Sequence, residues 1–82
     1  MDQHELHQRV LAILRDVLGV PDLEVEDSHS AREIPNYDSL AHIQILVQCQ
    51  QAFGVKLTAM EAGQIANFGE LKSTIARKLE SS

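Results

Sequence analysis

The sequence predicts an all-α fold in which four helices surround one hydrophobic core. Apolar residues recur at helical spacing in three segments, and helix start and stop signals bracket these segments. No stretch shows the alternation of apolar and polar residues that is typical of a β-strand. We therefore expect one domain spanning residues 1–82, a bundle with a short third helix and a long loop after the first helix.

The first helix is predicted to begin near Leu6 and to end near Leu18. Gly19 can adopt the left-handed conformation of a helix C-cap, and Pro21 cannot continue a helix. The apolar positions expected on its inner face are Leu6, Val10, Ile13, Leu14, Val17 and Leu18.

Residues 20–37 lack sustained periodicity, and they contain both prolines of the chain and five acidic residues. This composition predicts a long acidic loop with room for one short helical turn. Loops of this length are uncommon in compact domains unless they serve a function or are anchored by apolar residues of their own. Leu23, Val25 and Ile34 are the candidates for such anchors.

A second helix is predicted to begin at Asp38 or Ser39 and to run to Phe53, with Gly54 as its stop. The residues expected to face inward are Leu40, Ile43, Leu46, Val47 and Phe53. Those expected to face outward are Ala41, Gln44, Gln48 and Gln51.

A short third helix is predicted from the capping box of Thr58 and Glu61, which satisfy each other's free amides. It should run from Ala59 towards Gln64 or Ile65. The preceding residues 55–57 are expected to be a connector, because a lone strand would leave its backbone donors and acceptors unpaired.

The fourth helix is predicted to start with Asn67 as its cap and Glu70 three residues later. Its expected inner face consists of Phe68, Leu71, Ile75 and Leu79. Lys72, Arg77 and Lys78 are expected on the outside, where the last two suit the helix C-terminal dipole.

The composition excludes several classes of function. Twelve acidic against seven basic residues give a formal charge of −5, and nucleic acids or anionic membranes bind clusters of Lys and Arg that this chain lacks. A domain of 82 residues can build one modest core but no deep catalytic cleft, so we expect no enzyme activity. The N-terminus has neither the charge pattern nor the apolar run of a signal peptide, and we expect a cytoplasmic protein.

No metal site or reactive thiol is expected. His4 and His7 are one residue too close for the zinc-binding spacing of two histidines four residues apart, and His29 has no partner in the sequence. The single cysteine, Cys49, cannot form an internal disulfide and lies in an apolar segment, where it should be a small core residue.

The most informative residues are Asp38, Ser39 and Leu40, where the long loop meets the longest apolar helix. A serine at a helix N-terminus lies beside unpaired amides and the positive end of the helix dipole, where an attached phosphate diester is favoured. Leu40 should anchor the helix to the core. The simpler alternative is that Asp38 or Ser39 only caps the helix. Nucleophilic catalysis by Ser39 with His42 and Asp38 is disfavoured, since no enclosed pocket or oxyanion site is visible.

Together with the acidic charge and the four predicted helices, these residues resemble the acyl carrier proteins. The matching stretches are Tyr37-Asp38-Ser39-Leu40, Ala52-Phe53-Gly54-Val55, Thr58 with Glu61, and Phe68-Gly69-Glu70-Leu71. The resemblance covers nearly the whole chain from Leu6 to Leu79. It implies that Ser39 receives a 4′-phosphopantetheine arm from coenzyme A through a phosphopantetheinyl transferase. It further implies that acyl-loading and acyl-processing enzymes recognise a monomeric carrier around Asp38, Leu40, Ala41, Gln44 and Gln48.

Two departures from the family pattern stand out. Asn36 replaces a glycine that many carriers have, but asparagine also tolerates positive φ. The second predicted helix carries glutamines where carriers of fatty acid synthesis usually display acidic residues, so electrostatic steering by this helix should be weak. We therefore expect a carrier dedicated to a specialised polyketide, hydroxy-acid or aminoacyl pathway. The alternatives are a general fatty-acid carrier and an unmodified helical interaction module.

Overall fold

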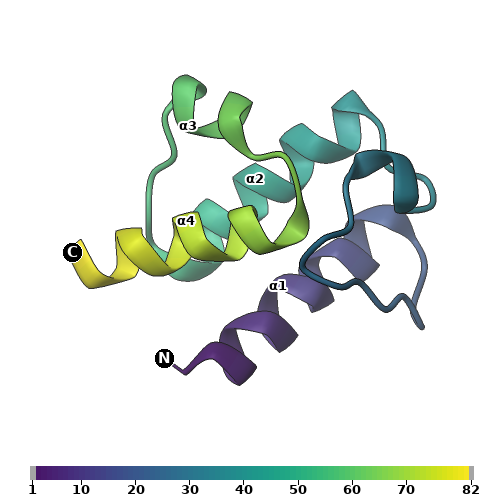
Figure 1. Cartoon of the computed structure of the whole chain (residues 1–82), viewed down its shortest axis with the longest axis horizontal. Helices are drawn as coiled ribbons and strands as arrows, with labels where there is room; N and C mark the ends of the chain where they lie inside the picture. Colours follow the sequence, from purple (N-terminus) through teal and green to yellow (C-terminus); the bar gives the residue numbers. More distant parts are fainter. Residues whose placement is uncertain (1, 82) are drawn as a thin grey trace.

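Four α-helices and one 3₁₀ turn make up the regular structure of residues 2–81, the part of the chain that the computed structural model describes. They are α1 (Gln3–Leu18), η1 (Ala31–Glu33), α2 (Ser39–Phe53), α3 (Ala59–Gln64) and α4 (Phe68–Ser81) (Figure 1). The helix α1 packs against α2 and α4, and α2 packs against α4. The predicted all-α architecture is confirmed. None of the helices in the described residues has the length and apolar character needed to cross a membrane.

The helix boundaries follow the predicted signals. Gly19 and Gly54 both adopt the left-handed conformation, with φ of 70° and 67°, and their amides donate to carbonyl oxygens one turn back in α1 and α2. The capping box before α3 is present, since Glu61 N donates to Thr58 Oγ1 at 3.1 Å and Thr58 N donates to Glu61 Oε1 at 3.0 Å. At the start of α4, Asn67 Oδ1 accepts from the amide of Glu70 at 2.8 Å.

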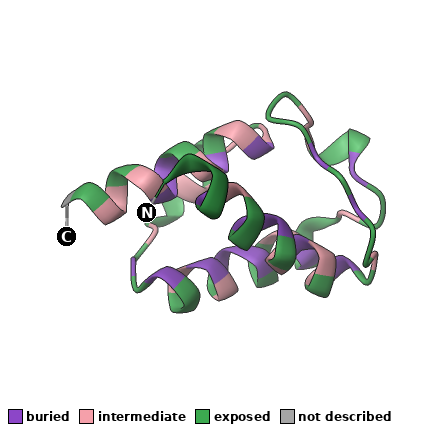
Figure 2. Cartoon of the chain, turned by 90° about the horizontal axis from the view of Figure 1, so that it is seen from below, coloured by how far each residue is buried: buried purple, intermediate pink, exposed green. Residues whose placement is uncertain are grey.

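The hydrophobic core is formed by the inner faces of the three longer helices and by parts of the long loop (Figure 2). The predicted loop anchors Leu23, Val25 and Ile34 are all buried. The fully buried side chains of greatest volume are Leu11, Leu14, Ile45, Ile75, Val10 and Cys49. Cys49 is thus the core residue that its apolar surroundings predict, and burial raises the pKa of its thiol to about 12.

The predicted inner face of α2 is wrong at three of its five positions. Leu40, Ile43 and Val47 are exposed, Leu40 to 63%, whereas Ala41 is buried at 7% although it was expected on the outside. The buried row instead repeats every four residues and consists of Ala41, Ile45, Cys49 and Phe53, with Leu46 beside it. Because α2 is apolar on nearly every side, its spacing alone does not identify the face that packs against α1 and α4.

The loop between α1 and α2 is held against the start of α4 by backbone hydrogen bonds. The amide of Gly69 donates to Asp27 O at 2.9 Å, and the amide of Phe68 donates to His29 O at 3.0 Å. A Cβ atom on Gly69 would lie only 2.9 Å from Asp27 Cβ, so this close approach requires glycine. The loop is therefore fixed against the start of α4.

Lys72 also joins the loop to the helices, contrary to its predicted outward position. Its side chain is only 16% exposed, and its Nζ atom forms an ion pair with Asp27 at 2.5 Å. The same atom lies 2.9 Å from His7 Nδ1 and over the ring of Phe68. Lysine stems pack along apolar surface while the charged end finds a partner, which explains the inward position.

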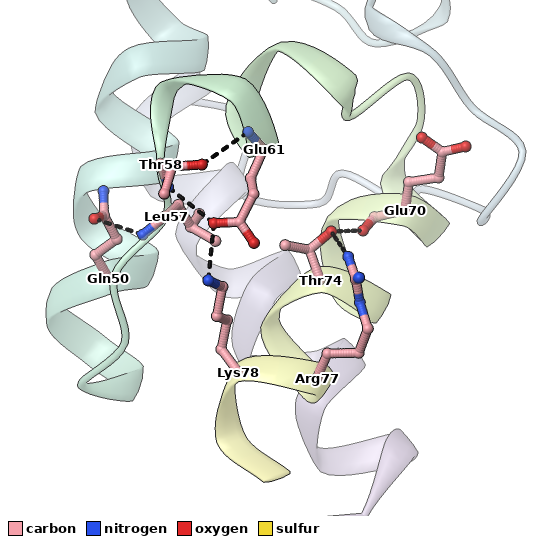
Figure 3. A network of polar contacts seen from close by, with 8 residues as sticks. All are labelled: Gln50, Leu57, Thr58, Glu61, Glu70, Thr74, Arg77 and Lys78. Carbon is pink, nitrogen blue, oxygen red and sulfur yellow. Dashed lines mark hydrogen bonds and ion pairs between the residues drawn. The ribbon is translucent and has the colours of Figure 1, made fainter. Parts of the chain in front are cut away.

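Polar contacts help to hold α3 in place, because none of its residues is fully buried and Ala62 packs only partly against the core. Figure 3 shows Lys78 of α4 reaching Glu61 of α3, with Nζ 2.8 Å from Oε1. Just before α3, the amide of Leu57 donates to Gln50 Oε1 of α2 at 3.0 Å. The start of α3 and the residue before it are thus joined to α4 and to α2 by one contact each.

Candidate functional site

The first turn of α2 presents Ser39 on a fixed backbone. Asp38 is the cap residue, and its Oδ1 atom accepts from the amide of Ala41 at 2.8 Å. Its carbonyl oxygen accepts from the amide of His42 at 2.9 Å. Because Asp38 caps the helix, the hydroxyl of Ser39 is not used for capping, and Ser39 is the exposed first residue of α2.

The chain leading into this turn is held by its side chains. Asn36 adopts a φ of 64°, as its residue type allows, and its Nδ2 atom donates to Leu18 O at the end of α1 at 3.1 Å. The hydroxyl of Tyr37 forms a short hydrogen bond with Nδ1 of His42 in α2. Burial raises the pKa of Tyr37 to about 12, with a smaller contribution from Cys49. Ser39 therefore lies between two residues that bind each other.

A hollow of about 500 Å³ opens beside Ser39. Its rim includes the exposed Asp38 and Ser39, and Tyr37 and His42 are half-buried on its wall. The buried residues that line it are Leu14, Ile34, Phe68 and Leu71, and Ile65 and Ala66 contribute from the α3–α4 connection. The hollow thus changes from polar at the rim to apolar at the floor.

The residues predicted to recognise partners do not all lie on one surface. Leu40 and Gln44 are exposed near Ser39, Gln48 is half-buried, and Asp38 lies at the rim of the hollow. Ala41 faces the core instead, so its predicted place on this surface is wrong. The predicted role of Leu40 as a core anchor is also wrong, because its side chain points to solvent.

Two exposed apolar residues of α2, Ile43 and Val47, were missed as surface residues. With Gln44 and Gln48 of α2 and with Asp16 and Val17 of α1, they line a shallow groove of about 470 Å³ between the two helices. We call the exposed residues Leu40, Ile43 and Val47 the apolar stripe of α2. Their spacing of three and four residues is itself the signal that could have placed them together on one side.

The catalytic and metal-binding alternatives find no support in the described residues. His42 uses Nδ1 to bind Tyr37, and no hydrogen bond between His42 and Ser39 is present in that part of the chain. No group of three or more His, Cys, Asp or Glu residues within 2–81 could hold a metal ion.

Comparisons with known proteins agree on one family. A family model described as "Phosphopantetheine attachment site" matches residues 8–75. A curated protein named "Acyl carrier protein" from Rubrobacter xylanophilus is 34% identical over 70 residues, which are 85% of this chain and 86% of that protein. Another of the same name from Thermosynechococcus vestitus is 29% identical over 79 residues, 96% of this chain and 98% of its own length.

The fold is also found among solved structures. The solution NMR structure of a holo acyl carrier protein from Geobacter metallireducens matches with a TM-score of 0.85 and 24% sequence identity. The match covers 93% of this chain and 87% of that one. The arrangement of the helices in this chain is therefore similar to that of the solved carrier protein.

Proposed function

Since this chain belongs to the phosphopantetheine-bearing acyl carrier proteins, we propose that Ser39 is the residue to which its 4′-phosphopantetheine arm is attached. The chain is a carrier and not an enzyme. The arm, when bound, supplies the thiol on which an acid is held as a thioester. The protein's own residues supply the attachment oxygen, the surface that partner enzymes recognise and the hollow beside it.

The single observation that carries this proposal is the position of Ser39. It is the exposed first residue of a 15-residue helix, and it lies on the rim of the hollow. The first amides of a helix have no acceptor within it, and together with the helix dipole they favour an attached phosphate. The nearest carboxylate, that of Asp38, accepts from Ala41 N, which partly offsets its charge.

The three other serines in the matched region fit an arm less well. Ser28 is an exposed residue of the long loop and does not line the hollow. Ser30 Oγ already donates to Glu33 Oε1 at 3.2 Å. Ser73 is an exposed residue within α4, and the hollow of about 210 Å³ beside it is lined by polar and charged residues. None of the three offers both a helix N-terminus and an adjacent apolar floor.

We propose further that the floor of the hollow shelters part of the acyl group. Its buried residues Leu14, Phe68 and Leu71 are apolar, and placing a hydrocarbon group against them removes apolar surface from water at about 25 cal/mol per Å². The polar wall nearer Ser39 suits the amide-containing arm. An acid carried in this way is protected from water until a partner enzyme takes it up.

The surface of α2 supports a dedicated carrier rather than one for general fatty acid synthesis. Residues 39–53 contain no Asp, Glu, Lys or Arg, and the apolar stripe of Leu40, Ile43 and Val47 lies beside Gln44. Such a surface fits partner enzymes that bind through apolar contacts and hydrogen bonds, and it offers little to a basic patch. We therefore propose partners from a specialised pathway.

Attachment is tested by intact mass spectrometry after incubation with coenzyme A and a promiscuous phosphopantetheinyl transferase. We expect one addition of the arm's mass to the wild type and none to Ser39→Ala. Ser73→Ala is the matched control and should gain the arm as the wild type does. Circular dichroism should show Ser39→Ala to be folded, because Asp38 provides the helix cap. A modified Ser39→Ala variant, or a wild type that never gains the arm, would refute the proposal.

A further inference from the structure

Tyr37 and His42 form a hydrogen-bonded pair that the proposed function leaves without a role. Tyr37 lies two residues before Ser39 and His42 three residues after it, and the two rings lie 5.7 Å apart between centroids. Both are half-buried on the wall of the hollow whose rim includes Ser39. The pair therefore lines the same hollow as Ser39, from residues that precede and follow Ser39 in the chain.

The helix geometry directs the ring of His42 towards Ser39. Side chains three residues apart share a face of a helix, with Cβ atoms about 5–6 Å apart. The Cα–Cβ bond tilts towards the helix N-terminus, so a side chain covers the turn before its own Cα atom. For His42 that turn contains Ser39. The contact with Tyr37, which precedes α2, is consistent with a ring turned in this direction.

From this geometry we propose that His42 is a positioning residue for the arm, which it holds by donating a hydrogen bond from Nε2 to the phosphate diester on Ser39. Tyr37 orients the ring by occupying Nδ1. The inference rests on the proposed attachment at Ser39. A phosphate on Ser39 also lies at the start of α2, where the helix dipole and free amides favour it.

The contact with Tyr37 is compatible with a proton on Nε2. Tyr37 retains its hydroxyl proton at neutral pH, since burial raises its pKa to about 12. In a neutral ring the hydroxyl donates to Nδ1, and the ring proton then lies on Nε2. In a charged ring Nδ1 donates to the hydroxyl oxygen, and Nε2 again carries a proton. Both forms can donate from Nε2 to a phosphate oxygen. The negative phosphate therefore favours them over the neutral tautomer that carries its only ring proton on Nδ1.

Few titratable groups other than His42 line the hollow beside Ser39. His29 and Tyr37 of the long loop and Asp38 at the cap line the same hollow, and α3 and α4 contribute no titratable residue to its lining. His29 likewise has its Nδ1 atom occupied, since that atom accepts from the amide of Glu26 at 3.0 Å, but His29 lies in the loop and not on the helix that bears Ser39. His29 is therefore the matched control for His42, with the same ring on the same hollow but on a different element.

The test is ³¹P NMR of the loaded protein between about pH 5 and 8, where a histidine changes charge and a phosphate diester does not. We expect the wild-type signal to shift in one step across this range. His42→Gln keeps an N–H donor but cannot titrate, so its signal should stay constant, and His29→Gln should retain the step. Tyr37→Phe removes the orienting hydroxyl and should reduce the size of the step.

A second measurement reads the contact directly. Nuclear Overhauser contacts should join the ring protons of His42 to the arm protons next to the phosphate, and they should be absent from His42→Ala. A step that persists in His42→Gln, or one that disappears in His29→Gln instead, would overturn the inference. Failure of the attachment itself is seen separately, as a protein whose mass does not change on incubation with coenzyme A and the transferase.

Discussion

Leu40 and Leu46 are the same residue type on the same helix but lie in opposite surroundings. Leu40 is 63% exposed beside Ser39, and Leu46 is 7% exposed next to the buried row of α2. The spacing of apolar residues predicts both to lie in the core. In the structure only Leu46 contributes to the packing of the bundle, and Leu40 is free to contact a partner.

Replacing each of these two leucines by alanine should lower the free energy of unfolding by very different amounts. We expect Leu46→Ala to lower the free energy of unfolding by about 2–5 kcal/mol, because it removes buried methyl groups and leaves a cavity. Leu40→Ala should change it by no more than about 0.5 kcal/mol. Urea denaturation followed by circular dichroism measures both values. Equal losses in the two variants would contradict the observed orientation of α2.

At the scale of the element, α3 differs from the other three helices. It is six residues long and has no fully buried residue, so its capping box and the ion pair between Glu61 and Lys78 supplement the partial packing of Ala62 against the core. Its C-terminal connection contributes Ile65 and Ala66 to the wall of the hollow beside Ser39. The polar contacts drawn in Figure 3 therefore help to shape the candidate site.

The anchoring of α3 should weaken in acid. The hydrogen bond from Lys78 and those within the capping box lower the pKa of Glu61 from 4.5 to about 2. A carboxyl whose pKa is lower in the folded state stabilises the fold above its unfolded pKa, and this contribution is lost as the pH falls from about 4.5 towards 2. We expect the wild type to be more stable than Glu61→Gln at neutral pH, by a modest amount because the pair is partly exposed.

Urea denaturation of both proteins at several pH values tests this expectation. Glutamine preserves the capping box, so the comparison isolates the charge of Glu61. The difference in stability should shrink as the pH falls through the stated range. A difference that stays constant down to pH 2 would show that the charge of Glu61 does not anchor α3.

At the scale of the whole molecule, the charges are unevenly distributed. The formal charge is −5, yet α2 has no Asp, Glu, Lys or Arg, and five of the twelve acidic residues lie in the loop of residues 20–37. The exposed face of α2 therefore carries the apolar stripe and no Asp, Glu, Lys or Arg side chain, and the carboxylate next to Ser39 is that of Asp38 at the helix cap. A basic partner would be attracted over long range by acidic residues outside α2, such as those of the loop of residues 20–37.

Binding to an enzyme of general fatty acid synthesis should accordingly be weak and nearly independent of salt. Charged surfaces are screened over about 10 Å at 0.1 M salt, and α2 offers none to screen. The double variant Gln44→Glu and Gln48→Glu should bind such an enzyme severalfold more tightly at low salt than at high salt. Isothermal titration calorimetry across a salt series measures both. Tight, salt-sensitive binding of the wild type would contradict this account of α2.

The sequence by itself determined the helices and their ends. Asp38 before α2, Gly19 and Gly54 after α1 and α2, and the pair of Thr58 and Glu61 all act within one turn of the chain, so their effect follows from residues three or four positions apart. For the same reason Ser39 could be placed at the start of a helix from the sequence, and the structure identifies Asp38 as the cap and Ser39 as the first residue.

Only the tertiary structure decided which side of α2 is buried and what surrounds Ser39. A helix whose apolar residues are spread around its axis can turn several faces inward, and the choice of Ala41 and Ile45 over Leu40 and Ile43 depends on how α1 and α4 pack against it. The hollow likewise requires the loop, α2 and the start of α4 to meet. Such contacts join residues far apart in the chain, and local spacing carries no information about them.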